Sequence, residues 1–210
     1  MGNTNIDNLI KILGKLPGVG PRQARRFAYS LTRHNGILAN ELVNTLNGLK
    51  GHIFSCSLCG ATSLGSGPVC NVCIGENRNP KILTLVANQE DYDSLYTIES
   101  YRGMLSIVPF PIKIEMAENI NVIEKSYIPK TIEHWIEKGM EEIILAFPIS
   151  PEGEVMESIM LDYLETINDK LTNNKTTITT LGRGMSLGAR LSESDDETIR
   201  YAIDNRKRAI

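Results

Sequence analysis

Residues 16–31 read LPGVGPRQARRFAYSL, and this stretch organises the first part of the chain. Apolar residues recur at the spacing of one helix face over residues 6–13, before the stretch, and again over residues 24–31, within it. Between the two, Pro17-Gly18-Val19-Gly20 interrupts both periods, and Pro21 suits the first turn of a new helix. The stretch therefore predicts a helix, a turn that contains two glycines, and a second helix.

The turn and the residues around it form a candidate DNA-binding site. Glycine has no Cβ, so the backbone can approach a ligand closely, and the first amides of a helix have no intrahelical acceptor and can bind an anion. The string resembles the helix-hairpin-helix DNA-binding motif, which grips phosphates without reading bases. A tight turn between two core helices with solvated arginines is the alternative. The candidate DNA-binding residues are Lys15, Gly18, Gly20, Arg22, Arg25 and Arg26.

Charge is distributed unevenly along the 210 residues. The formal net charge is −3, but the first 35 residues carry six Lys and Arg against one acidic residue, so the remainder carries −8. This asymmetry indicates local, salt-sensitive binding of a polyanion rather than a uniformly basic DNA coat. We find no signal peptide and no apolar run long enough for a bilayer, and we expect a cytoplasmic, nucleoid-associated protein that contacts no membrane.

All four cysteines fall in one window as two C-x2-C knuckles separated by ten residues: Cys56, Cys59, Cys70 and Cys73. This spacing is typical of one Zn²⁺ ion held by four thiolates, with Gly60 and Gly75 allowing the turns behind the knuckles. Because every ligand position is a cysteine, the zinc should be structural. Disulfides are the competing interpretation, which a reducing compartment disfavours.

From residue 81 onward, short apolar runs alternate with amphipathic segments, which predicts a parallel sheet covered by helices on both faces. The expected strands are 82–86, 104–108, 142–146 and 176–180, and the expected helices are 90–96, 131–138, 155–167 and 195–205. Residues 109–128 follow neither pattern clearly.

Two loops follow strands of the predicted sheet, where ligands of open parallel sheets bind. Glu152 and Glu154 lie in the first loop and could hold Mg²⁺ if another carboxylate converged on them, or they could be solvated residues at a helix start. The second loop, 181–188, is rich in glycine and contains Arg183, which suits a phosphate or a partner protein but equally a plain loop.

Taken together, the motifs resemble the RecR family of bacterial recombination mediators over essentially the whole chain. The matching motifs are Leu16-Pro17-Gly18-Val19-Gly20-Pro21, the four cysteines, Tyr101-Arg102-Gly103, Glu152-Gly153-Glu154 and Arg183-Gly184. The resemblance implies an α/β chain in four parts: a helix-hairpin-helix region over 1–52, a four-cysteine zinc finger over 53–77, a Toprim-type α/β domain over 78–180, and a C-terminal loop and helix over 181–210.

The same resemblance implies a function without catalysis. Proteins of the family bind single- and double-stranded DNA without sequence preference and assemble as dimers or ring-like tetramers. They act with RecO or RecF to help RecA replace single-strand-binding protein at gaps. Carried onto this chain, the DNA contacts fall on Arg22 and Arg26, with Lys15 and Arg25 beside them, and the partner surface on Glu152 and Glu154.

The chain also departs from the family pattern. Ala87 stands where family members place an acidic residue after the first strand of the domain, Pro148-Ile149 replaces Asn-Pro, and residues 189–192 differ as well. A two-metal Toprim catalyst needs several convergent carboxylates, so the loss at Ala87 disfavours catalysis. Two alternatives stay open: a Mg²⁺-dependent nuclease or topoisomerase-like enzyme, and an adaptor that binds only proteins.

Overall fold

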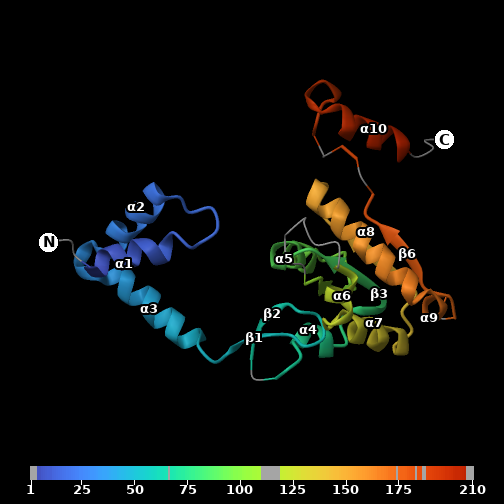
Figure 1. Ribbon diagram of the computed structural model, residues 1–210, viewed down its shortest axis with the longest axis horizontal. Coiled ribbons are helices and arrows are strands. Elements are labelled where there is room, and N and C mark those ends of the chain that lie inside the picture. The colour runs from blue at the N-terminus through green and yellow to red at the C-terminus, as the bar shows by residue number, and fades with distance from the viewer. Residues whose placement is uncertain are drawn as a thin grey trace. The chain divides into compact units, whose positions relative to one another are not determined.

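The computed structural model describes residues 4–65, 67–109, 119–173, 175–182, 184–185 and 188–206 (Figure 1). The chain divides into two compact units. The first unit comprises Met1–Phe54 and Leu64–Ser66, and the second comprises Ser55–Ser63 and Gly67–Ile210. The chain crosses from one unit to the other within a small hairpin, β1 (Ile53–Ser55) and β2 (Thr62–Leu64).

The first unit contains the predicted helix pair. Helix α1 spans Thr4–Leu13 and α2 spans Pro21–Thr32, with Pro21 in the first turn of α2 as expected. Ala24 and Ala28 are buried, and their small side chains let α1 and α2 pack closely. Phe27, which the periodicity placed on the same stripe, is instead 43% exposed.

A third helix in this unit was not predicted. This helix, α3 (Ile37–Leu49), follows a short 3-10 turn, η1 (His34–Gly36). The backbone turns into α3 through three consecutive residues with positive φ, and no side chain caps its start. The helix therefore lacks the Ser, Thr, Asp or Asn signal by which a sequence usually announces a helix.

The second unit is built on a four-stranded parallel sheet, which confirms the predicted α/β architecture. The strand order is β4-β3-β5-β6. The strands are β3 (Asn79–Val86), β4 (Gly103–Ile107), β5 (Glu142–Ala146) and β6 (Thr177–Thr180). The helices are α4 (Asn71–Ile74), α5 (Gln89–Thr97), α6 (Asn119–Glu124), α7 (Ile128–Glu137), α8 (Pro151–Thr166), α9 (Asn168–Asn173) and α10 (Asp196–Asp204), with a 3-10 turn η2 (Leu191–Glu193).

Helices cover both faces of the sheet, as expected. The step from β3 to β4 runs one way across the sheet and the steps to β5 and β6 run the other, so right-handed crossovers place α5 opposite α7 and α8. On the α7–α8 face, Leu83 and Leu85 of β3 join the main apolar cluster, which contains Trp135 of α7 and Leu164 of α8. Residues of opposite parity on β3, such as Val86, are equally buried but lie outside that cluster.

Candidate metal centre and nucleic-acid interface

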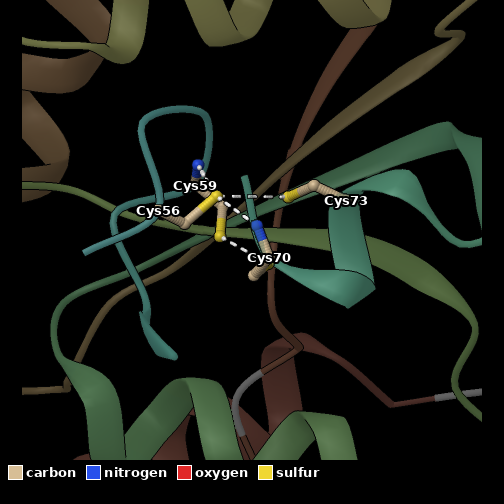
Figure 2. A group of neighbouring side chains, drawn as sticks. All are labelled: Cys56, Cys59, Cys70 and Cys73. Carbon is tan, nitrogen blue, oxygen red and sulfur yellow. Dashed lines mark hydrogen bonds between the residues drawn. The ribbon is translucent and has the colours of Figure 1, made fainter. Parts of the chain in front are cut away.

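The four cysteines come together in one buried cluster (Figure 2). The exposed fraction of each is 8% or less, and all four sulfur atoms lie within 4.8 Å of one another. The two knuckles interleave, because Cys56 Sγ lies 3.9 Å from Cys73 Sγ and Cys59 Sγ lies 3.7 Å from Cys70 Sγ. Among the described residues, these cysteines are the only group of three or more potential ligands with such geometry.

The sulfur separations fit a tetrahedral metal site and not disulfides. A Zn–S bond of about 2.3 Å places the sulfurs of a tetrahedral site about 3.8 Å apart, whereas a disulfide needs about 2.05 Å. All four cysteines are free of disulfides. The backbone amides of Cys59 and Cys70 also point to Cys56 Sγ, at 3.5 and 3.3 Å, which favours a thiolate at that atom.

The thiols perturb one another strongly. The hydrogen bond between Cys59 and Cys70 raises the pKa of Cys59 and lowers the pKa of Cys70. The pKa of Cys73 is raised, first by its hydrogen bond with Cys59 and then by Cys70 and by burial. Four such thiols cannot all ionise without a compensating cation, so a divalent metal is what their arrangement fits.

Two glycines shape the knuckles for different reasons. Gly60 has φ +73°, and the Tyr127 hydroxyl occupies the place where its Cβ would be, so both backbone and space require glycine. Gly75 has an ordinary φ of −77°, but a Cβ there would lie 2.8 Å from the Asn71 carbonyl oxygen. Both glycines were expected to allow turns. At Gly75, however, glycine is required because α4 approaches the backbone closely, and not because of the backbone conformation.

The first knuckle is fastened to the sheet. The Cys59 carbonyl accepts hydrogen bonds from the Ile107 amide at 2.9 Å and from the Ser106 hydroxyl at 3.3 Å. The hydroxyl of Thr131 on α7 donates to the Leu58 carbonyl. The knuckle thus covers the free edge of β4, which would otherwise expose unpaired backbone groups.

In the first unit, the two glycines of the hairpin have different conformations. Gly18 has φ +74°, which favours glycine, whereas Gly20 is the N-cap of α2 with φ −75° and an extended backbone. Nothing lies within 4 Å of a Cβ built at either position. Neither backbone strain nor packing therefore explains glycine at position 20. The first helical hydrogen bond of α2 runs from the Ala24 amide to the Gly20 carbonyl at 2.9 Å, which leaves the Arg22 and Gln23 amides without intrahelical acceptors.

The arginines that follow line one hollow of about 390 Å³ on the surface of α2, together with Pro21 and Tyr29. Arg22, Arg25 and Arg26 are exposed, and none forms an ion pair with a carboxylate in the described part of the chain. Tyr29 is 50% exposed. Tyr29 was not predicted as a site residue, although its spacing of three and four residues from Arg26 and Arg25 could have indicated it. Lys15 is exposed in the hairpin itself.

The two glutamates open helix α8. Glu152 and Glu154 are exposed in its first turn, and Ser150 caps the helix by accepting a hydrogen bond from the Gly153 amide at 3.2 Å. A Cβ at Gly153 would collide with the Pro148 carbonyl, so close packing requires glycine between the two glutamates. Within the described ranges no third carboxylate joins the two glutamates in a metal-binding group.

Other positions singled out in the sequence have mixed outcomes. Ala87 follows β3 and packs against the apolar cluster. Arg183 lies outside the described residues, as do residues 110–118 of the stretch that matched no pattern. None of the helices in the described part of the chain combines the length and hydropathy that crossing a membrane requires.

Comparisons with known proteins agree with these features. A family model described as "RecR, helix-hairpin-helix" matches residues 6–49. A protein named Recombination protein RecR from Rickettsia bellii is 23% identical over 205 residues, which cover 98% of this chain and 96% of the relative. A protein of the same name from Mycoplasmopsis pulmonis is 29% identical over 208 residues, which cover 99% and 100%. Another, from Ureaplasma urealyticum, is 26% identical over 200 residues and covers 95% and 94%. The chain is therefore a distant homologue, over almost its full length, of proteins named Recombination protein RecR, and its first helices match the RecR helix-hairpin-helix model.

Proposed function

We propose that this chain is a DNA-binding recombination mediator without catalytic activity, which acts with RecO or RecF to help load RecA on single-stranded DNA at gaps. The observation that carries the proposal is full-length similarity to proteins named Recombination protein RecR, combined with three exposed arginines beside the hairpin that form no ion pair with the described carboxylates. The DNA-binding residues in this proposal are Lys15, Gly18, Gly20, Arg22, Arg25 and Arg26.

We infer that DNA contacts the hairpin through its phosphates. The amides of Arg22 and Gln23, which have no acceptor within the helix, and the open space at Gly20 suit a phosphate at the start of α2. Arginine side chains on the same helix add positive charge, and none of these groups needs to reach a base edge. The binding would therefore depend on salt and not on sequence.

We propose one structural Zn²⁺ ion in the cysteine cluster. The ion would be held by Cys56, Cys59, Cys70 and Cys73, which leaves no open coordination position. It would supply folding energy to the knuckle that covers the β4 edge, and no reaction step is assigned to it.

We also propose a homo-oligomer, a dimer or a ring-like tetramer, that works in the cytoplasm at the nucleoid. Its support is the apolar surface of α3, where five aliphatic side chains are between 43% and 60% exposed: Ile37, Leu38, Leu42, Val43 and Leu46. Contiguous apolar surface of this kind is typical of interfaces between proteins. Mass by light scattering should show an oligomer, and Leu42→Lys should lower that mass if this face is buried in it.

The test is a RecA-loading assay on gapped DNA coated with single-strand-binding protein. RecA assembly should accelerate when this chain and RecO or RecF are added together, and should not accelerate with Arg22→Ala/Arg26→Ala. No acceleration with either partner would contradict the mediator role. Mg²⁺-dependent cleavage of DNA that disappears in Glu152→Ala would also contradict the mediator role and would show that the protein is an enzyme.

A further inference from the structure

A second basic pocket lies in the second unit, and none of its lining residues is among those assigned above to DNA or metal, although Asn71 and Val72 lie between the ligands Cys70 and Cys73. It has a volume of about 310 Å³ and lies between α4, α5 and the turn that leads into β4. Two arginines line it, Arg78 and Arg102, together with Tyr96 and the amide side chains of Asn71 and Asn77. No carboxylate is among its described lining residues.

Arg78 is held rigidly at the wall of this pocket. Its Nε donates to the Gly103 carbonyl at 2.9 Å, and its Nη2 donates to the Tyr101 carbonyl at 3.4 Å. Its guanidinium lies over the Tyr96 ring, 5.4 Å from the centroid. Both hydrogen bonds use one side of the guanidinium, so Nη1 stays available to a ligand. A guanidinium fixed in this way loses little side-chain entropy when it binds an anion.

The neighbouring motif Tyr101-Arg102-Gly103 explains how the second arginine is presented. Tyr101 is half-buried and its hydroxyl hydrogen-bonds with Thr84, while a Cβ at Gly103 would collide with the Tyr101 ring. The Arg102 carbonyl accepts from the Asn79 amide at 2.6 Å, which fixes its backbone to β3. The Arg102 side chain is left exposed, and the described residues offer it no ion pair.

We propose that this pocket is a second nucleic-acid contact, which binds single-stranded DNA with a phosphate on Arg78 and Arg102 and a base against Tyr96. The proposal rests on the proposed function and extends it to the second unit. Single-strand binding sites combine a positively charged groove with aromatic side chains on which bases stack. As a whole residue Tyr96 is 50% exposed, so it has surface to offer an unpaired base beside the Arg78 guanidinium.

An acidic peptide is the competing occupant, and the lining favours DNA over it. Peptide sites draw most of their affinity from a few anchor side chains in well-packed, fully desolvated pockets. Val72 is the only aliphatic side chain among the described lining residues, and it is only partly buried. The amides of Asn71 and Asn77 suit the polar edges of a nucleotide, since an amide side chain both donates and accepts hydrogen bonds.

The test compares variants of the full-length protein by fluorescence anisotropy with an oligo(dT) of about 20 nucleotides and with duplex DNA. Arg102→Gln should raise the Kd for the single strand about fivefold at 0.1 M salt, and flatten the log–log salt slope by about 0.7. Tyr96→Leu should raise that Kd by about fivefold or more and leave duplex affinity unchanged, because paired bases are already stacked. Arg190→Gln is the matched control, since Arg190 is an exposed arginine of the same unit outside the pocket.

The outcomes separate this proposal from the function on which it rests. If wild type binds DNA and Arg102→Gln and Tyr96→Leu behave like Arg190→Gln, the pocket is not a DNA contact while the hairpin proposal stands. If wild type binds no DNA at all, both proposals are wrong. If Arg102→Gln abolishes binding of an oligoglutamate peptide and leaves DNA binding intact, the occupant is an acidic peptide.

Discussion

The hydroxyl of Tyr127 occupies the space that a Cβ atom would need at Gly60. The same hydroxyl donates a hydrogen bond to the Ile107 carbonyl on β4. This contact joins the first cysteine knuckle, the edge strand and the start of α7 at one point, so the metal centre is part of the packing of the sheet and not an appended finger.

Gly60→Ala should therefore destabilise the second unit strongly. The substitution adds left-handed backbone strain at φ +73° to a collision with Tyr127, and we expect a loss of roughly 2–4 kcal/mol in unfolding free energy. Urea denaturation would measure it. Gly67→Ala is the control, because its Cβ would lie 3.6 Å from the nearest atom, an ordinary contact. Equal stability of the two variants would show that the Gly60–Tyr127 contact is not rigid.

Removal of the metal, or Cys70→Ser, should loosen the same region. Wild type should contain about one Zn²⁺ per chain, and its loss should lower the melting temperature because metal binding contributes directly to folding. Zinc analysis by mass spectrometry and thermal unfolding would check this. A Cys70→Ser protein that melts like wild type yet fails to bind DNA would contradict the structural role.

Gly20→Ser tests why glycine precedes α2. Serine is a good N-cap and the backbone at position 20 is extended, so stability should be retained. The added side chain should instead obstruct a phosphate at the amides of Arg22 and Gln23, and we expect a loss on the order of 1 kcal/mol in DNA binding, about one hydrogen bond. Anisotropy and urea denaturation on the same sample would separate the two effects. Lower stability with unchanged affinity would make Gly20 a structural residue.

The environment of Asp91 should make the stability of the folded protein depend on pH. Its Oδ2 is buried without a hydrogen-bond partner among the described residues, and burial raises the pKa of the carboxyl, with Glu90 adding to the shift. A carboxyl whose pKa is higher in the folded state costs stability above that pKa and nothing once it is protonated in both states. Asp91→Asn should thus be more stable than wild type at pH 7, and the difference should vanish below about pH 4. A constant difference across this range would show that the Asp91 charge is not responsible.

The sequence was informative where local periodicity and chain breakers agree. Residues 142–146 were predicted as a strand and form β5 with those bounds, because the run is short, apolar and flanked by polar residues. The α1–α2 pair follows from two apolar periods interrupted by a proline and two glycines. In contrast, α3 was missed, since its apolar side chains are largely exposed within their unit and its start has no capping side chain.

Contacts between residues distant in the chain could not be predicted from the sequence. The pairing of Gly60 with Tyr127 and of Arg78 with Gly103 depends on how strands and loops meet, and no local pattern encodes it. The cysteine cluster is the exception, because four thiols in two knuckles restrict their own arrangement. The candidate arginines lie on one exposed surface, whereas their contact with DNA stays a prediction.

The most direct measurement of the central claim is the salt dependence of DNA binding by wild type and by Arg22→Ala/Arg26→Ala, followed by anisotropy. Arg33→Ala serves as the control, since Arg33 is an exposed arginine at the end of α2 that does not line the hollow. We predict that the double substitution weakens binding alike for unrelated sequences and flattens the log–log slope by about one to two, because about one counterion is released for each phosphate that an arginine neutralises. A slope equal to that of wild type and Arg33→Ala would show that these arginines do not touch DNA, and the hairpin would then be a structural turn.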